Sequence, residues 1–159
     1  ELPYKLYVVN SVQEEIGLRG AQMITQSIKP NVAIITDVCH ETSSPCYTAS
    51  KEGEHVAGQG GVITRAPAVH NKLRKLVIDT ANKKKIPFQL AASSTSTGTD
   101  TDAFAYSNGG VPSVLISLPL KYMHTTCETV HKDDVESVIK MIYHTLLNIE
   151  ENHNFKYNS

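Results

Sequence analysis

Residues 9–21 read Val-Asn-Ser-Val-Gln-Glu-Glu-Ile-Gly-Leu-Arg-Gly-Ala, and the rest of the chain is organised around this stretch. The first residues of this stretch are the end of an apolar run, and the composition of that run predicts a buried strand over residues 4–12. Gly17 and Gly20 are typical of a turn. We expect that turn to lead into a helix over residues 18–27. The stretch therefore predicts a strand, a tight turn and a helix in sequence.

Two adjacent carboxylates, Glu14 and Glu15, lie on this strand-to-helix turn. Neighbouring side chains in a nearly extended segment point in different directions, so the two can serve different purposes. One carboxylate could hold a metal ion while the other moves a proton on a nearby water, as a metal-assisted hydrolase requires. On its own, a Glu-Glu pair is more simply a polar surface turn. The remaining residues decide between these interpretations.

Composition limits the classes of protein that fit. A chain of 159 residues with 40% hydrophobic and 19% charged residues is typical of one soluble globular domain. The net charge of −1 predicts no general attraction to nucleic acid or to anionic membranes. No apolar run approaches the roughly 20 residues of a membrane helix. The three cysteines form no CxxC motif, which argues against a disulfide framework or a thiolate zinc site and favours a cytoplasmic location.

Continuous apolar strands alternate with amphipathic helices along the rest of the chain. We expect strands at 32–36, 62–64, 87–91 and 111–118, and helices at 71–84, at 102–107 and from 133 onward. This order predicts an α/β fold, a three-layer αβα sandwich around a mixed, mostly parallel sheet. The strand at 62–64 is expected at an edge of that sheet. A long irregular loop is expected over 38–60, and a loop over 119–132.

The last helix carries the clearest periodicity. Asp133 is its expected N-cap, and Glu136 stands three residues later as a capping-box partner. Its expected buried face comprises Val135, Val138, Ile139, Ile142, Leu146 and Ile149. Residues 152–159 form a polar tail that we expect to be frayed.

Polar residues collect just beyond the ends of the expected strands. Glu14 and Glu15 follow the first strand, Asp37 closes the second, and His124 follows the last. Ligands of open α/β sheets bind outside the carboxyl ends of the parallel strands, so these side chains are expected at one rim. Carboxylate and imidazole donors without thiolates suit Zn²⁺, Co²⁺ or Mn²⁺. Each residue also has an ordinary interpretation, Asp37 as a loop cap and His124 as a loop histidine.

These pieces together resemble the glutamyl-aminopeptidase family of dinuclear-metal exopeptidases, which includes the tetrahedral aminopeptidases and proteins once labelled endoglucanase M. Residues 12–21 look like the family's signature. The resemblance continues in order through Asp37 and residues 86–89, 98–100, 110–112 and 118–124. It covers nearly the whole chain and implies a zinc-exopeptidase-like fold with peptides as substrates.

The resemblance also implies roles for individual residues. Glu14 would be the general acid/base that takes a proton from a metal-bound water. Glu15 and His124 would ligate one of two divalent metal ions, zinc or cobalt, and Asp37 would ligate the other. Gly98, Thr99 and Asp100 would line the substrate pocket.

The family has five metal-binding side chains, and two of them, an early His and a bridging Asp, have no counterpart in these residues. We therefore expect residues 1–151 to be the C-terminal part of a catalytic domain, with homo-oligomers formed by the full-length protein. We also expect the segment alone to hold no dinuclear centre. The alternative is a truncated, non-catalytic α/β scaffold or assembly domain. A deacylase or glucanase on the same metal chemistry is a third possibility, although the chain has no tryptophan to stack on sugars.

Overall fold

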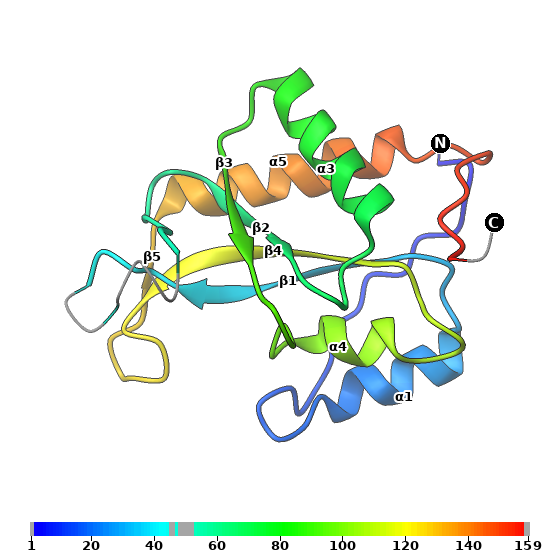
Figure 1. The fold of residues 1–159 in the computed structure, drawn as a ribbon, viewed down its shortest axis with the longest axis horizontal. Coiled ribbons are helices and arrows are strands. Elements are labelled where there is room, and N and C mark those ends of the chain that lie inside the picture. The colour runs from blue at the N-terminus through cyan, green and yellow to red at the C-terminus, as the bar shows by residue number, and fades with distance from the viewer. Residues whose placement is uncertain (1, 45–46, 48–52, 158–159) are drawn as a thin grey trace.

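A single mixed sheet forms the middle of the molecule (Figure 1). The computed structural model describes residues 2–44, 47 and 53–157. The strands are β1 (Ala33–His40), β2 (Gly61–Arg65), β3 (Phe88–Ala92), β4 (Ser113–Lys121) and β5 (Thr129–Val130). The sheet order is β1-β4-β2-β3, with β5 on the end of β4. β1 pairs parallel to β4 and β2 parallel to β3, whereas β2 and β4 are antiparallel. The prediction of a mixed, mostly parallel sheet is confirmed.

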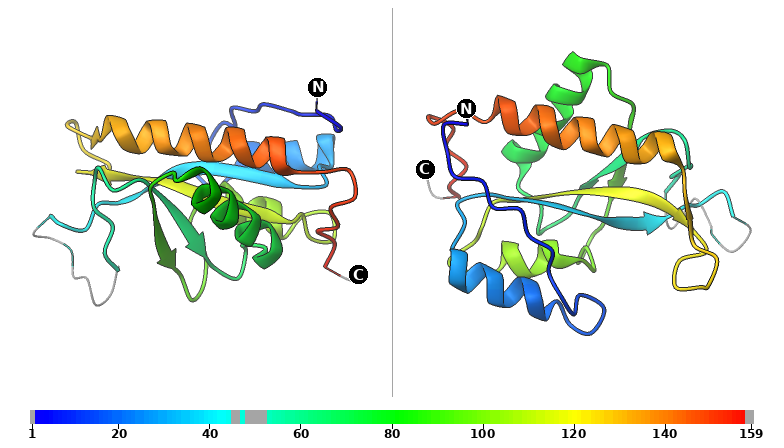
Figure 2. Two further views of the ribbon diagram at one scale, coloured as in Figure 1. Left: turned by 90° about the horizontal axis from the view of Figure 1, so that it is seen from above. Right: turned by 180° about the vertical axis from the view of Figure 1, so that it is seen from behind.

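Helices cover both faces of this sheet (Figures 1 and 2). On one side lie α1 (Arg19–Ile28) and the short α4 (Asp100–Ala105), and on the other lie α3 (Asn71–Lys84) and α5 (Lys132–Asn148). The expected helix at 71–84 is found with the same bounds. The structure thus has the αβα layers that the sequence predicts. No helix in the described part of the chain is both long enough and apolar enough to cross a bilayer.

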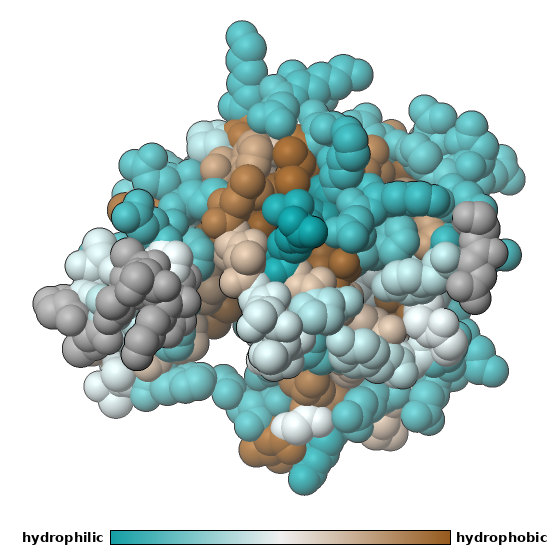
Figure 3. Space-filling view, viewed as in Figure 1, coloured by the Kyte–Doolittle hydropathy of each residue, from teal (hydrophilic) through white to brown (hydrophobic). Residues whose placement is uncertain are grey.

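The core lies between the sheet and the layer formed by α3 and α5. Ile63 of β2, Ile116 of β4, Leu73 of α3 and Met141 of α5 are fully buried there. Burying one such side chain contributes about 1.5–3 kcal/mol, so this layer anchors the fold. On the face seen in Figure 3, hydrophobic residues reach the surface near β3 and α3, with hydrophilic side chains around them. Leu90 of β3 is among the exposed ones.

The prediction of a strand over 4–12 is wrong, because this segment crosses the molecule without joining the sheet (Figure 2). Val8 is 91% exposed, and Leu6 and Val9 are each 45% exposed. An apolar run becomes a strand only where a neighbouring edge accepts its backbone hydrogen bonds, and here no described strand pairs with it. The segment is held at its start by Tyr4, whose hydroxyl donates to the Leu146 carbonyl over 2.5 Å.

Three strands differ from their predicted positions. β2 is internal rather than at an edge, because it lies between β4 and β3. β1 does not close at Asp37 but continues to His40, which is opposite Leu120 of β4. β4 likewise extends to Lys121, and β5 occupies part of the expected loop over 119–132. Apolar composition does not predict these extensions, because the added residues include polar ones that are nevertheless paired in the sheet. Within the expected loop over 38–60, residues 45–46 and 48–52 lie outside the described part.

The last helix begins one residue earlier than expected, and its buried face differs from the predicted one. Its N-cap is His131, whose Nδ1 accepts from the Asp133 backbone N–H, so the Asp133 cap was wrong. Ile139 was expected inside but is 60% exposed. The buried face instead includes Asp134, which lies on the inner side of the helix.

One residue of the predicted polar tail packs into the core. Phe155 is only 8% exposed and joins the core cluster, so it ties the end of the chain to the domain. Residues 158–159 lie outside the described part.

Candidate active site

The turn that carries Glu14 and Glu15 is built from backbone hydrogen bonds. The Glu14 carbonyl accepts from the N–H groups of Gly17 and Leu18 at 3.1 and 3.0 Å. The Gly20 N–H donates to the Val12 carbonyl at 2.9 Å, and these two backbones touch. A Cβ on Gly20 would lie 2.4 Å from the Val12 oxygen, which only glycine avoids. The sequence therefore bends tightly here and presents both glutamates.

Glu15 meets His124 across 109 residues of sequence. The Nε2 atom of His124 lies 3.1 Å from Oε1 of Glu15. Both side chains are largely exposed, at 68% for His124 and 71% for Glu15. The contact brings together two residues predicted to share a metal ion. An exposed pair of this kind adds little to stability, so its interest is chemical.

The His124 loop follows β4 and has an unusual backbone. Tyr122 and His124 both have positive φ, 58° and 61°, a region that costs energy for residues other than glycine. Gln13, next to Glu14, also has a positive φ of 60°. Glu128 holds the loop, because its carboxylate accepts from the His124 backbone N–H at 2.6 Å. Such conformations concentrate at functional sites.

Asp37 lies on β1 and is partly buried. Its Oδ1 accepts from the Val38 N–H at 2.7 Å. Burial raises the pKa of Asp37, with a further rise from the charges of Asp100 and Glu15 and an opposing effect from the Val38 N–H. Asp37 therefore interacts electrostatically with Glu15 of the turn and with Asp100.

Glu14 has the same neighbours. Burial raises its pKa, and the charges of Asp37, Glu15 and Asp100 raise it further, while His124 acts in the other direction. Like charges held close together disfavour ionisation of each. A carboxylate with a raised pKa is better able to carry a proton near neutral pH.

The loop over 97–100 closes this side of the site. Asp102 holds it, with one carboxylate accepting from the backbone N–H groups of Thr97 and Gly98 at 3.0–3.1 Å. Thr99 caps α4 by accepting from the Thr101 N–H. Asp100 accepts from the Ser11 hydroxyl through Oδ2, while its Oδ1 is buried and has no hydrogen-bond partner among the described residues. An orphaned carboxylate oxygen is costly and suits a cationic ligand.

The predicted metal ligands are only partly assembled. Within the described residues, no three His, Cys, Asp or Glu side chains are grouped so that they could hold a metal ion. Glu15 and His124 supply two donors in contact, but Asp37 does not form a group of three with them. The donor types fit zinc or cobalt, but these residues alone do not complete a four-ligand site.

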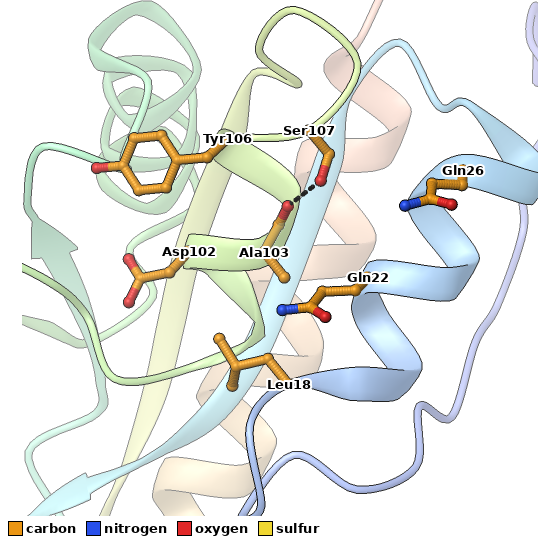
Figure 4. A pocket seen from close by; sticks show the side chains of 7 residues that line it. All are labelled: Leu18, Gln22, Gln26, Asp102, Ala103, Tyr106 and Ser107. Carbon is orange, nitrogen blue, oxygen red and sulfur yellow. Dashed lines mark hydrogen bonds between the residues drawn. The ribbon is translucent and has the colours of Figure 1, made fainter.

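A groove of about 430 Å³ lies beside the turn, between α1 and α4 (Figure 4). Leu18 forms one end of it, and Gln22, Gln26, Asp102 and Tyr106 line its sides. Leu18 directly follows Gly17 of the glutamate turn, so the groove adjoins that turn.

Sequence reasoning missed three supporting residues. Ser11 contacts Asp100, Glu128 holds the His124 loop, and Asp102 holds the 97–100 loop. Only Asp102 carried a local signal, since Thr99 and Asp102 have the spacing of a capping box. Burial raises the pKa of the Cys39 thiol to about 12, which disfavours the reactive thiolate.

Comparison with known proteins shows that this chain is similar to aminopeptidases. The lysyl aminopeptidase of Pyrococcus furiosus is 36% identical over 138 residues, covering 86% of this chain and 38% of the relative. The structure of a TET aminopeptidase from a marine sediment Thaumarchaeota archaeon superposes with a TM-score of 0.80 at 28% identity, covering 89% of this chain and 39% of that one. The TET1 peptidase of Pyrococcus horikoshii gives a TM-score of 0.65 at 27% identity, covering 88% and 39%.

The chain thus shares its fold with aminopeptidases of known structure. The sequence model of the M42 glutamyl aminopeptidases matches residues 1–141, and the chain belongs to that family. The chain spans about two fifths of the length of each relative above.

Proposed function

We propose that the protein is a metal-dependent aminopeptidase that removes N-terminal residues from peptides. The observation that carries the proposal is the contact between Glu15 and His124, flanked by Glu14 and Asp37. Membership of the M42 family supports a peptidase function. We assign Glu15 and His124 to one divalent metal ion and Asp37 to a second, with the remaining donors supplied from outside these residues.

Bound metal would supply an activated water and would polarise the scissile carbonyl. Glu14 would accept the proton of that water and return it to the leaving amine, as a general acid/base does. Gln13 and Leu18, which have positive φ on either side of Glu14 and Glu15, shape the turn that carries these glutamates.

Several carboxylates in one place also explain how a free N-terminus is recognised. Glu14, Glu15, Asp37 and Asp100 act on one another electrostatically, and an ammonium group relieves that repulsion. The orphaned Oδ1 of Asp100 is one candidate acceptor. Gly98 and Thr99 would line the pocket beside it.

Replacement of Glu14 by Gln tests the proposal. We expect the whole protein carrying Glu14→Gln to lose about 10²- to 10⁴-fold in kcat while it keeps its metal, because the amide cannot accept the proton. Steady-state hydrolysis of peptide amides measures kcat, and metal analysis of the same sample measures the retained metal. Glu150→Gln, an exposed change at the end of α5, is the matched control and should stay at the wild-type rate. Unchanged turnover in Glu14→Gln would remove Glu14 from the mechanism.

A non-catalytic scaffold is the second candidate, favoured by the absence of a three-donor group among the described residues. The Pyrococcus horikoshii TET1 peptidase can assemble into a tetrahedron or a large octahedral shell. We accordingly propose that the full-length protein forms homo-oligomers, whichever function it has. Metal binding with the loss of activity in Glu14→Gln would separate the enzyme from the scaffold.

A further inference from the structure

A second hollow, of about 850 Å³, opens where the ends of β2 and β3 meet the start of α3. Its wall includes Arg65, His70, Lys72, Ser93, Ser94 and Tyr157. None of these residues belongs to the candidate active site. The hollow therefore needs an explanation of its own.

The charge of this hollow is positive. Arg65 and Lys72 line it, and no Asp or Glu is among its lining residues in the described part of the chain. Neither cation takes part in an ion pair with any described residue, whereas Lys75, farther along α3, pairs with Asp79. Cations that gather in a concave surface without a counter-charge attract anions.

Arg74 follows the lining residues His70 and Lys72 on α3 and carries a buried donor. It lies one turn into α3, where its backbone N–H donates to the His70 carbonyl at 2.9 Å. Its Nε is buried and has no hydrogen-bond partner among the described residues. Burial lowers the pKa of Arg74, and the nearby charge of Arg65 lowers it further. The positive charges of Arg65 and Arg74 thus repel each other, and neither residue forms an ion pair with another described residue.

The surrounding groups leave the cations available. Nδ1 of His70 caps α3 by accepting from the Leu73 N–H, and burial lowers the His70 pKa, which favours the neutral ring and offsets none of the positive charge. The rings of Phe155 and Tyr157 stand edge-on to His70 and hold it in place. The start of α3 faces the hollow with the positive end of its dipole.

We propose that this hollow binds an oxyanion, the phosphate or carboxylate group of a small ligand, held by Arg65, Lys72 and Arg74. A guanidinium fork matches both kinds of oxyanion in geometry. The bound charge would relieve the repulsion between the arginines and give the Arg74 Nε–H an acceptor. This site is independent of the proposed peptidase chemistry.

Calorimetric titration of the protein with inorganic phosphate and, separately, with acetylglycine tests the site at constant ionic strength. We expect at least one of the two to bind. Arg65→Gln should weaken that binding about tenfold or more, because a hydrogen bond to a charged group is lost. Arg74→Gln should do the same. Lys83→Gln removes an exposed charge at the far end of α3 and should leave the affinity unchanged.

Binding of phosphate alone would identify a phosphorylated ligand, and binding of acetylglycine alone would identify a carboxylate. Arg65 is exposed at the end of β2, so its variant should fold, and circular dichroism checks this. Binding of neither anion would overturn the proposal. Equal binding by wild type, Arg65→Gln and Arg74→Gln would overturn it as well.

Discussion

Glu14 owes its properties to its neighbours more than to its position in the sequence. A glutamate on a surface turn ordinarily keeps its usual pKa, whereas burial and three nearby carboxylates raise the pKa of Glu14 here. Those carboxylates come from its own turn, from β1 and from the start of α4. The chemistry of one residue is thus set by three separate elements.

Gly20 controls where this residue stands. Gly20→Ala would place a Cβ 2.4 Å from the Val12 carbonyl oxygen, so the backbone must move. We expect a loss of about 1–3 kcal/mol in the free energy of unfolding, together with reduced peptidase activity in the whole protein. Urea denaturation and an activity assay measure the two effects. Met23→Ala, at a residue of the same helix that is 73% exposed, should change neither, and a stable, active Gly20→Ala would show that the close approach is not required.

His70 predicts how stability depends on pH. Burial lowers its pKa from the ordinary 6.5, and Lys72 lowers it further. The unfolded chain therefore takes up a proton near pH 6.5, while the folded protein resists it until a lower pH. The free energy of unfolding should fall as pH falls below about 6.5, since the unfolded state then binds more protons.

The variant His70→Asn isolates this effect, because asparagine can cap α3 but does not titrate. Denaturation at a series of pH values from 7.5 to about 5 should show a shallower pH dependence in the variant than in the wild type. Parallel curves for the two proteins would show that His70 does not contribute.

At the scale of elements, α5 is fastened to the loop before β2 by a buried carboxylate. Asp134 is fully buried and accepts from the backbone N–H groups of Gly58 and Gly60, each at 2.7 Å. Ser137, one turn on, accepts from the Gly61 N–H at 2.8 Å. These bonds explain why polar residues occupy the inner face of this helix.

Asp134→Ala should therefore destabilise the protein by about 2–3 kcal/mol, because it leaves two backbone donors without an acceptor. The neighbouring Asp133→Ala is a matched control: its side chain is 74% exposed, and the change should cost less than about 0.5 kcal/mol. Chemical denaturation of both variants gives the comparison. Equal stabilities would contradict the role of Asp134.

The same elements show what a sequence can and cannot foretell. The helix at 71–84 was predictable because its apolar spacing and terminal lysines are local signals. The orientation of α5 was not, since Asp134 and Ser137 are buried by partners in the 58–61 loop that no periodicity reveals. Residues 4–12 look like a strand, but strand formation depends on a partner edge. The contact between Glu15 and His124 joins distant residues and could be foreseen only from topology and family resemblance.

At the scale of the molecule, the site has donors for metal but not a complete set. Glu15 and His124 touch, but no group of three donors that could hold a metal ion is found among the described residues. We predict that these 159 residues alone do not bind two zinc or cobalt ions with sub-micromolar affinity. Calorimetric titration with Zn²⁺ and Co²⁺ measures the stoichiometry. Tight binding of two ions would show that the present residues suffice.

The central claim is that the whole protein cuts peptides from a free N-terminus. The most direct measurement is mass spectrometry of two peptides of one sequence, one with a free amine and one N-acetylated, after incubation with the zinc- or cobalt-loaded protein. The account predicts stepwise loss of N-terminal residues from the free peptide and none from the acetylated one. The reason is that the carboxylates of the site bind the ammonium group of a free N-terminus, which the acetylated peptide lacks. Cleavage of both peptides, cleavage within the chain, or no cleavage of either by metal-loaded protein would contradict it.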